Sequence, residues 1–339
     1  MGLANNFRFS RRHIVGALTL GSLGLVACGK SSTEASSKAI RVGLVDWVGY
    51  SPLYVALAKG IFKELGIDLD AKTFQGNNEE KIAFVGGRLD GAADVLSSGV
   101  ELANSNKDFR IVMVIDRSVG ADGILASNKI ADLKGFQGQK VALEEGTVSH
   151  YFFLQVLAGV GLTGKDITII NASPGDAAAA YQSRNVDIAV TYAPFLGKAN
   201  AIRKDGRIIY DSSKNPYAIA DIYEFDARFI EEHPDTLQAF VTGFFKGLDY
   251  IKAHPEESAE IVAKELKITV AEVTEFLKGV QLADIPTNLD MLTNPASQGY
   301  VPKTMATLAQ FLLDQGQIKA IPDLAKLIEP KFVLAAQKA

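Results

Sequence analysis

Short β-rich runs alternate with helical runs over most of the chain, and this alternation limits the possible folds more than any other feature. The runs interpreted as strands cover residues 40–45, 68–74, 91–96, 109–115, 122–126, 139–143, 167–171, 187–192 and 207–210. Helices are expected between them, for example over 79–88, 148–158 and 175–183. This order predicts an α/β fold with mainly parallel sheets and with ligands at the carboxyl ends of the strands. With 339 residues, 47% of them hydrophobic, the chain can form two lobes.

The character of the sequence becomes helical after Asp226. His233-Pro234-Asp235 and His254-Pro255-Glu256 each place a proline in the first turn of a helix and an acid near its positive end. Apolar residues then recur at helical spacing, namely Leu237, Phe240, Val241, Phe244, Phe245, Leu248 and Ile251. The spacing predicts a buried helix face and not a cofactor site.

The segment 46–60 joins the first predicted strand to a helix. Pro52 suits the first turn of that helix, and Gly60 suits its end. Trp47 and Tyr50 therefore lie in a loop at the carboxyl end of a strand, facing a helix N-terminus, where open α/β sheets bind ligands.

Residues 47–62 read W-x-G-Y-x-P-L-Y-x-A-x-x-K-G-x-F. This pattern resembles the opening of the solute-binding proteins of nitrate, sulfonate and taurine type ABC importers. Further similar segments follow in family order at 116–123, 133–135, 144–150, 186–195 and 220–222, so the resemblance covers roughly residues 40–330.

The resemblance implies the fold of a type II periplasmic binding protein. In that fold two Rossmann-like lobes are joined by a hinge, a ligand cleft lies between them, and a helical C-terminal tail packs on lobe one. Lobe one is expected to comprise residues 40–120 and 220–339, and lobe two residues 121–219.

The N-terminus carries the features of an export signal over residues 1–27. Basic residues, among them Arg11 and Arg12, precede an apolar run over 14–27, which is short for a transmembrane helix. The sequence Ser10-Arg11-Arg12 also looks like a twin-arginine signal.

Leu25-Val26-Ala27-Cys28 resembles a bacterial lipobox. The resemblance implies that Cys28 is acylated, for instance with palmitate, and that residues 28–39 tether a periplasmic protein to the membrane. The alternative is a generic secretory signal with a chance cysteine. Because Cys28 is the only cysteine, the exported part has no disulfide and no thiolate metal site.

Two nucleotide-binding motifs occur by letter and are rejected on context. Residues 24–31 satisfy the P-loop pattern, but they span the expected cleavage point and precede a serine-rich tether. Residues 159–164 satisfy the dinucleotide pattern, but they follow a helix and precede a strand, the reverse of the required order. Those glycines are interpreted as a helix end and a turn.

The candidate ligand-binding residues all lie in loops between predicted strands and helices. They are Asp46, Trp47, Tyr50, Ser97, Asp116, Ser118, Asp122, Glu144, Thr147, Tyr192 and Asp221. Asp122 also has a structural interpretation, as a turn residue beside Gly120 and Gly123.

The acids among these candidates favour a ligand with a positive group. A carboxylate 4 Å from a bound anion repels it by roughly 4 kcal/mol at a protein-like dielectric. Trp47 and Tyr50 can instead add cation–π contacts to an ammonium or guanidinium group. Helix N-termini near the same loops suit anions, so an aminosulfonate zwitterion such as taurine satisfies both features. An amine-bearing zwitterion or a small organic cation such as guanidinium is expected first, and nitrate, bicarbonate or an alkanesulfonate last.

The sequence gives little support to other functional classes. A net charge of −4 with interspersed signs gives no case for nucleic acid. The fold family includes a pyrimidine-precursor synthase branch with a cysteine-rich motif, which this chain lacks, and no catalytic triad or metal spacing is recognised. A periplasmic sensor is the other alternative. The expected protein is a non-enzymatic, monomeric, lipid-anchored binding protein without cofactor or metal, which delivers a small-molecule ligand to an ABC permease and its ATPase.

Overall fold

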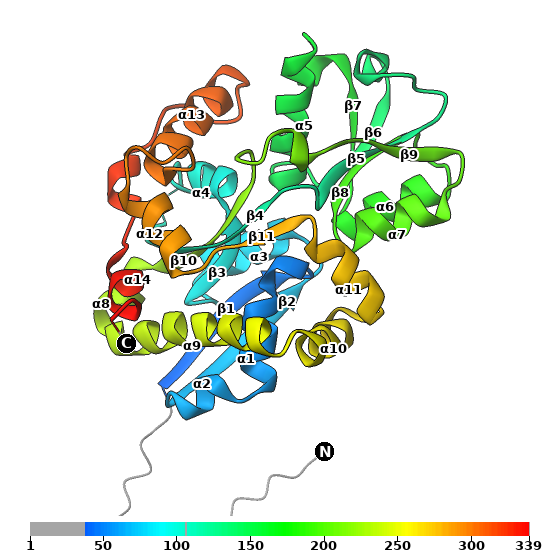
Figure 1. Ribbon diagram of the computed structural model, residues 1–339. Coiled ribbons are helices and arrows are strands. Elements are labelled where there is room, and N and C mark those ends of the chain that lie inside the picture. The colour runs from blue at the N-terminus through cyan, green and yellow to red at the C-terminus, as the bar shows by residue number, and fades with distance from the viewer. Residues whose placement is uncertain (1–37, 106, 339) are drawn as a thin grey trace, which may run out of the picture. The chain divides into compact units, whose positions relative to one another are not determined.

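The strands form two sheets in the computed structural model, which describes residues 38–105 and 107–338 (Figure 1). The first sheet has six strands, in spatial order Val280–Leu282 (β11), Phe109–Ser118 (β4), Ala220–Asp226 (β10), Gly91–Val95 (β3), Lys38–Val45 (β1) and Ile67–Phe74 (β2). The second sheet has five, in the order Thr168–Asn171 (β7), Lys140–Leu143 (β6), Ile188–Tyr192 (β8), Asp122–Ser127 (β5) and Gly206–Asp211 (β9). Each sheet with its own helices is called a lobe here, lobe one for the first sheet and lobe two for the second.

Both sheets are mixed, so the expectation of mainly parallel sheets is wrong. The parallel pairs are β1 with β2, β1 with β3, β6 with β7 and β6 with β8. The antiparallel pairs are β10 with β3, β10 with β4, β11 with β4, β5 with β8 and β5 with β9. The physical reason is that β5 and β10 each enter their sheet from the other sheet and not through a crossover helix from a strand of the same sheet, so nothing makes them parallel to their neighbours.

The helices of lobe one come from both ends of the described chain. They are Ser51–Ala58 (α1), Ile61–Glu64 (α2), Asn77–Val85 (α3), Leu96–Leu102 (α4), Ala227–Glu232 (α8), Pro234–Ala253 (α9), Pro255–Leu266 (α10), Val270–Leu277 (α11), Ile285–Thr293 (α12), Val301–Asp314 (α13) and Lys331–Ala336 (α14). Two 3-10 turns, Val48–Tyr50 (η1) and Leu324–Leu327 (η5), accompany them. The predicted helical tail is therefore present, with β11 inserted in it.

The long helix α9 packs against α1, as Figure 1 shows. Its predicted apolar face is buried except for Ile251, which is half-buried, and Phe240 and Phe244 both lie edge-on to the ring of Tyr223 in β10. The two helix backbones approach closely, since a Cβ placed on Gly247 would lie 2.1 Å from the carbonyl oxygen of Pro52. This contact ties the C-terminal half of the chain to the segment that follows β1.

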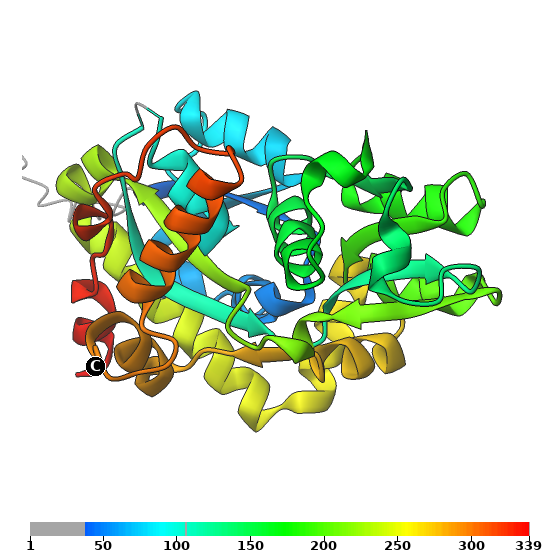
Figure 2. The same cartoon turned by 90° about the horizontal axis from the view of Figure 1, so that it is seen from above.

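Lobe two is built from one continuous piece of chain (Figure 2, green). Its helices are Val148–Gly159 (α5), Pro174–Gln182 (α6) and Phe195–Ile202 (α7), with 3-10 turns at Leu133–Phe136 (η2), Gly164–Asp166 (η3) and Ser212–Lys214 (η4). The rejected dinucleotide motif follows the structural interpretation, because α5 ends at Gly159 and Gly161 has a left-handed φ of 79°.

The nine predicted strands are all present, with ends shifted by a few residues, but β10 and β11 were not predicted. β10 carries Asp221, Glu224 and Asp226, so its composition is not that of a central strand. β11 has three residues and no periodicity to recognise.

The lobe boundaries predicted at 120/121 and 219/220 fall in the two connections between the sheets, and as domain boundaries they stay a prediction. The predicted signal, Cys28 and the P-loop letters lie outside the described residues. Within residues 38–105 and 107–338, no helix combines the length and apolar character needed to cross a bilayer.

Candidate functional site

Residues from both lobes surround one small cavity of about 20 Å³. The lining residues are Val45, Trp47, Tyr50, Asn77, Val95, Ile219 and Asp221, which lie in or next to lobe one, and Asp122, Val148 and Tyr192 from lobe two. Among these described residues there is no lysine, arginine or histidine. The cavity therefore combines apolar and aromatic walls with carboxyl groups and one amide.

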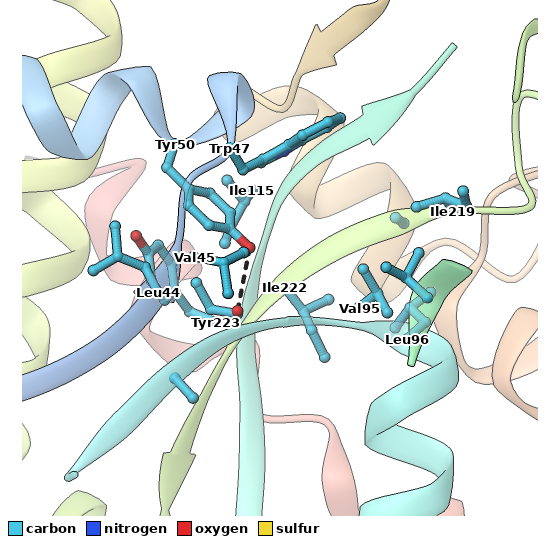
Figure 3. Close-up of a cluster of buried hydrophobic side chains, with 14 of the residues drawn as sticks. Leu44, Val45, Trp47, Tyr50, Val95, Leu96, Ile115, Ile219, Ile222 and Tyr223 are labelled. Carbon is cyan, nitrogen blue, oxygen red and sulfur yellow. Dashed lines mark hydrogen bonds between the residues drawn. The ribbon is translucent and has the colours of Figure 1, made fainter. Parts of the chain in front are cut away.

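The aromatic wall is made by Trp47, Tyr50 and Tyr192. Trp47 follows β1 in lobe one, Tyr192 ends β8 in lobe two, and their rings meet edge-on with 5.7 Å between centroids. The Tyr50 hydroxyl lies 3.0 Å from Asp221 Oδ2 and 3.2 Å from the carbonyl oxygen of Ala93. Figure 3 shows Trp47 and Tyr50 on the segment after β1, with Val95, Ile219 and other apolar side chains around them.

Asp116 fixes the tryptophan ring. The Trp47 indole Nε1 donates a hydrogen bond to Asp116 Oδ2 at 3.0 Å, and both side chains are buried. A Cβ on Gly49 would lie 2.0 Å from that carboxylate oxygen and 2.2 Å from the indole nitrogen. The glycine of the W-x-G-Y pattern is therefore required by the hydrogen bond between Trp47 and Asp116.

Three buried carboxyl groups, Asp116, Asp122 and Asp221, lie close enough to affect one another. Burial raises the pKa of Asp116 to about 8, and the neighbouring Asp122 adds to the rise. Burial also raises the pKa of Asp122 to about 7. Burial, followed by the charges of Asp116 and Asp122, raises the pKa of Asp221 well above its usual value. A positive group placed among these three carboxyls would favour their ionised forms.

Five of the predicted site residues line this cavity: Trp47, Tyr50, Asp122, Tyr192 and Asp221. Asp116 supports Trp47 from behind, and its Oδ1 has no hydrogen-bond partner among the described residues.

The other predicted site residues lie around the cavity without lining it. Asp46 is half-buried after β1, and Ser97 is buried in α4. Ser118 Oγ lies 2.7 Å from Ser212 Oγ at the connection between the sheets, and Thr147 Oγ1 donates to the carbonyl of Glu144 at 2.8 Å. The Glu144 carboxylate accepts hydrogen bonds from the N-terminus of α3. Ligand contact by these residues stays a prediction.

Sequence reasoning missed Asn77 and the apolar lining residues Val45, Val95, Val148 and Ile219. The Asn77 side-chain oxygen accepts a hydrogen bond from the Tyr192 hydroxyl at 3.4 Å, across the two lobes. The sequence pattern that could have identified Asn77 was present, because Gly76-Asn77-Asn78 follows a predicted strand and precedes a predicted helix. Among the described residues, no group of three or more His, Cys, Asp or Glu side chains is arranged to hold a metal ion.

Comparison with known proteins decides the family, because a family model described as the NMT1-like family matches residues 33–267. The chain belongs to the NMT1-like family. A Bacillus subtilis (strain 168) protein named for binding aliphatic sulfonates is 28% identical over 264 residues, which are 76% of this chain and 79% of that protein. The taurine-binding periplasmic protein of Escherichia coli (strain K12) is 24% identical over 309 residues, 88% of this chain and 94% of that protein.

A solved structure shares this fold. The alkanesulfonate-binding protein of Xanthomonas axonopodis pv. citri, bound to MOPS, aligns with a TM-score of 0.72 and 18% identity, over 86% of this chain and 98% of that chain. This NMT1-like protein is thus a solute-binding protein of the sulfonate, taurine and nitrate type of ABC importer. It is a binding protein and not an enzyme.

Proposed function

We propose that this NMT1-like protein captures a small organic cation, such as guanidinium, between its two lobes and delivers it to an ABC permease. One observation carries the proposal. The buried carboxyl groups of Asp122 and Asp221 line the cavity together with Trp47 and Tyr50, Asp116 lies behind Trp47, and no basic side chain lines the cavity among the described residues. A cation gains both ion pairing and cation–π contact in such a site.

A simple anion fits this cavity poorly. An anion finds no arginine or lysine lining the cavity among the described residues, and any of Asp116, Asp122 and Asp221 that is ionised repels it. One carboxylate at about 4 Å costs an anion roughly 4 kcal/mol at an effective dielectric of about 20. That cost is about half of the ~8 kcal/mol by which a micromolar complex is stabilised. The proposed ligand therefore differs in charge from the sulfonates after which the Bacillus subtilis and Xanthomonas axonopodis proteins are named.

A zwitterion such as taurine is the second candidate, favoured by one feature of lobe two. Val148, the first residue of α5, lines the cavity, and the side chain of the preceding Thr147 does not cap this helix. The free N–H groups of a helix N-terminus attract an anionic group. An aminosulfonate would place its amine near the aspartates and its sulfonate at α5.

Closure of the lobes follows from contacts that bridge them. Trp47 of lobe one touches Tyr192 of lobe two, and a ligand in the cavity reaches both. Only a ligand that contacts both lobes binds the closed form better than the open form, so only such a ligand shifts the equilibrium toward closure.

We further propose that the protein works in the periplasm as a monomer, anchored through acylated Cys28. The lipobox-like sequence and the relative named as a periplasmic protein support this location. Radioactive palmitate should label the wild-type chain in cells, and Cys28→Ala should abolish the label. A labelled Cys28→Ala variant would place the lipid elsewhere.

A thermal-shift panel on the purified full chain tests the ligand class. Guanidinium, choline, taurine, ethanesulfonate, nitrate and bicarbonate are compared at matched ionic strength. A ligand at 100 times its Kd stabilises the native state by about 2.7 kcal/mol, which raises the Tm by several degrees. A shift with guanidinium or choline supports the organic cation, and a shift with taurine alone supports the zwitterion. A shift with nitrate or ethanesulfonate alone would refute the acidic binding site.

A further inference from the structure

The carboxylate of Glu144 joins the two lobes beside the cavity. Glu144 follows β6 in lobe two, and its side chain reaches the N-terminus of α3 in lobe one. The backbone N–H of Asn77 donates to Oε2 at 3.1 Å, and the N–H of Asn78 donates to Oε1 at 3.0 Å. Glu144 is only 6% exposed, although it comes from a loop.

Two further hydrogen bonds surround this carboxylate. The Asn78 side-chain nitrogen donates to the carbonyl of Glu145 at 2.9 Å. Lys81, one turn further along α3, donates to the carbonyl of Gly146 at 3.0 Å. The loop 144–146 of lobe two is therefore held by the first turns of α3, and these four hydrogen bonds are called the α3 contact below.

Gly76 makes room for the carboxylate from the opposite side. A Cβ on Gly76 would lie 2.6 Å from Glu144 Oε1 and 3.0 Å from Glu144 Cδ. The backbone of Gly76 has φ −153° and ψ 161°, an extended conformation open to any residue. Glycine is therefore needed at position 76 because a side chain there would clash with Glu144, and not because the backbone conformation requires it.

The α3 contact adjoins the cavity without being part of it. Asn77 lines the cavity and accepts the hydrogen bond from Tyr192, whereas Glu144 is not a lining residue. A carboxylate at a helix N-terminus combines two charge-assisted hydrogen bonds with the favourable helix dipole. Because its partners belong to different lobes, the contact exists only while the lobes are together.

We propose that Glu144 is a positioning residue that sets ligand affinity by holding the lobes closed, without touching the ligand. The inference rests on the proposed function only in that a ligand binds between the lobes. The apparent affinity of a protein that binds in its closed form scales with the population of that form. Loss of the α3 contact therefore lowers affinity for every ligand that needs closure.

A double-mutant cycle across the lobes tests this role. The variants are Glu144→Ala, Gly76→Ala and the double variant. Glu145→Ala is the control, because Glu145 is exposed and only its backbone carbonyl, not its side chain, takes part in the α3 contact. Calorimetry with guanidinium on the purified full chain should give a Kd about tenfold weaker for each single variant. The double variant should match Glu144→Ala, since the new methyl group at position 76 then has no carboxylate to strike. Glu145→Ala should bind like the wild type.

A readout of the closed state separates positioning from a general loss of folding. Hydrogen exchange at the amides of Asn77 and Asn78 should slow on ligand binding in the wild type and in Glu145→Ala, but not in Glu144→Ala. The Tm of the ligand-free variants should stay near that of the wild type. Wild-type affinity in both single variants, or losses that add in the double variant, would overturn the proposal.

The experiments distinguish a wrong ligand class from a wrong role for Glu144. If an anion of the panel binds and guanidinium does not, the proposed cation is wrong, and the same cycle with that anion judges Glu144. If no compound of the panel binds, amide hydrogen exchange in the ligand-free proteins tests the role of Glu144. Faster exchange at Asn77 and Asn78 in Glu144→Ala than in the wild type supports the α3 contact, and equal rates refute it.

Discussion

Binding of a cation should release protons from the buried aspartates, and this linkage can be measured. Burial raises the pKa of Asp116 to about 8 and that of Asp122 to about 7. At pH 6 both carboxyls are therefore mostly protonated and neutral in the ligand-free protein. A bound cation favours the ionised forms, so the protons must leave.

The expected size follows from Asp116 alone. A carboxyl with a pKa of about 8 is ionised in about 1% of molecules at pH 6 and in about half at pH 8. A ligand that requires ionised Asp116 thus binds tens of times more tightly at pH 8 than at pH 6, a difference of about 2 kcal/mol. Near pH 7 roughly one proton leaves for each cation bound, and ionisation of Asp122 would add to this number.

Calorimetry in buffers of different ionisation enthalpy measures the released protons directly. Guanidinium is the probe, because it keeps its charge over this whole range of pH. Asp116→Asn is the control, and its pH dependence should be much flatter. An affinity that is constant or falls between pH 6 and pH 8, or uptake of protons on binding, would refute the reasoning.

Three substitutions test other parts of the structure. Asp116→Asn should stabilise the ligand-free protein by at least ~2 kcal/mol at pH 8, as measured by chemical unfolding. The reason is that the raised pKa of Asp116 makes the free energy of unfolding of the wild type fall as the pH rises from about 4 to about 8. A variant less stable than the wild type would contradict the raised pKa. Trp47→Phe removes the hydrogen bond to Asp116 and should weaken guanidinium binding about tenfold by calorimetry, so an unchanged Kd would exclude Trp47 from the site. Gly247→Ala should destabilise the protein by about 2–3 kcal/mol in chemical unfolding, because the new methyl group would clash with the Pro52 carbonyl. The control Gly99→Ala should not destabilise the protein, because a Cβ there would lie 3.5 Å from its nearest neighbour. Equal stabilities of the two variants would contradict the close packing of α1 and α9.

The parts of the fold that sequence predicted depend on local patterns. The face from Leu237 to Ile251 repeats at helical spacing, and α9 follows it closely. Trp47 and Tyr50 line the cavity, and their place after a strand was readable because a strand, a loop and a proline-led helix lie next to one another in the chain; that they contact a ligand stays a prediction. Such signals need no knowledge of distant residues.

The parts that sequence did not predict depend on long-range pairing. Asp221 and Glu224 make β10 look like a surface segment, and only its place between β3 and β4 buries them. Glu144 as a ligand contact stays a prediction, whereas its hydrogen bonds to Asn77 and Asn78 were not predicted, because these residues lie 67 and 66 positions away in the chain. No periodicity or spacing brings such residues together before the lobes are assembled.

The position of β10 also determines the order in which the lobes can form during synthesis. Lobe two has all its strands once residue 211 has left the ribosome, because β5 to β9 are consecutive. The sheet of lobe one lacks an inner strand until residue 226, and α9 and α14 come later still. The sheet of lobe one therefore stays incomplete while lobe two folds, with β1 to β4 already made but without β10 and the cover of α9 and α14. A ribosome stalled at the point where residue 215 has just left the exit tunnel should hold a protease-resistant lobe two and a protease-sensitive lobe one.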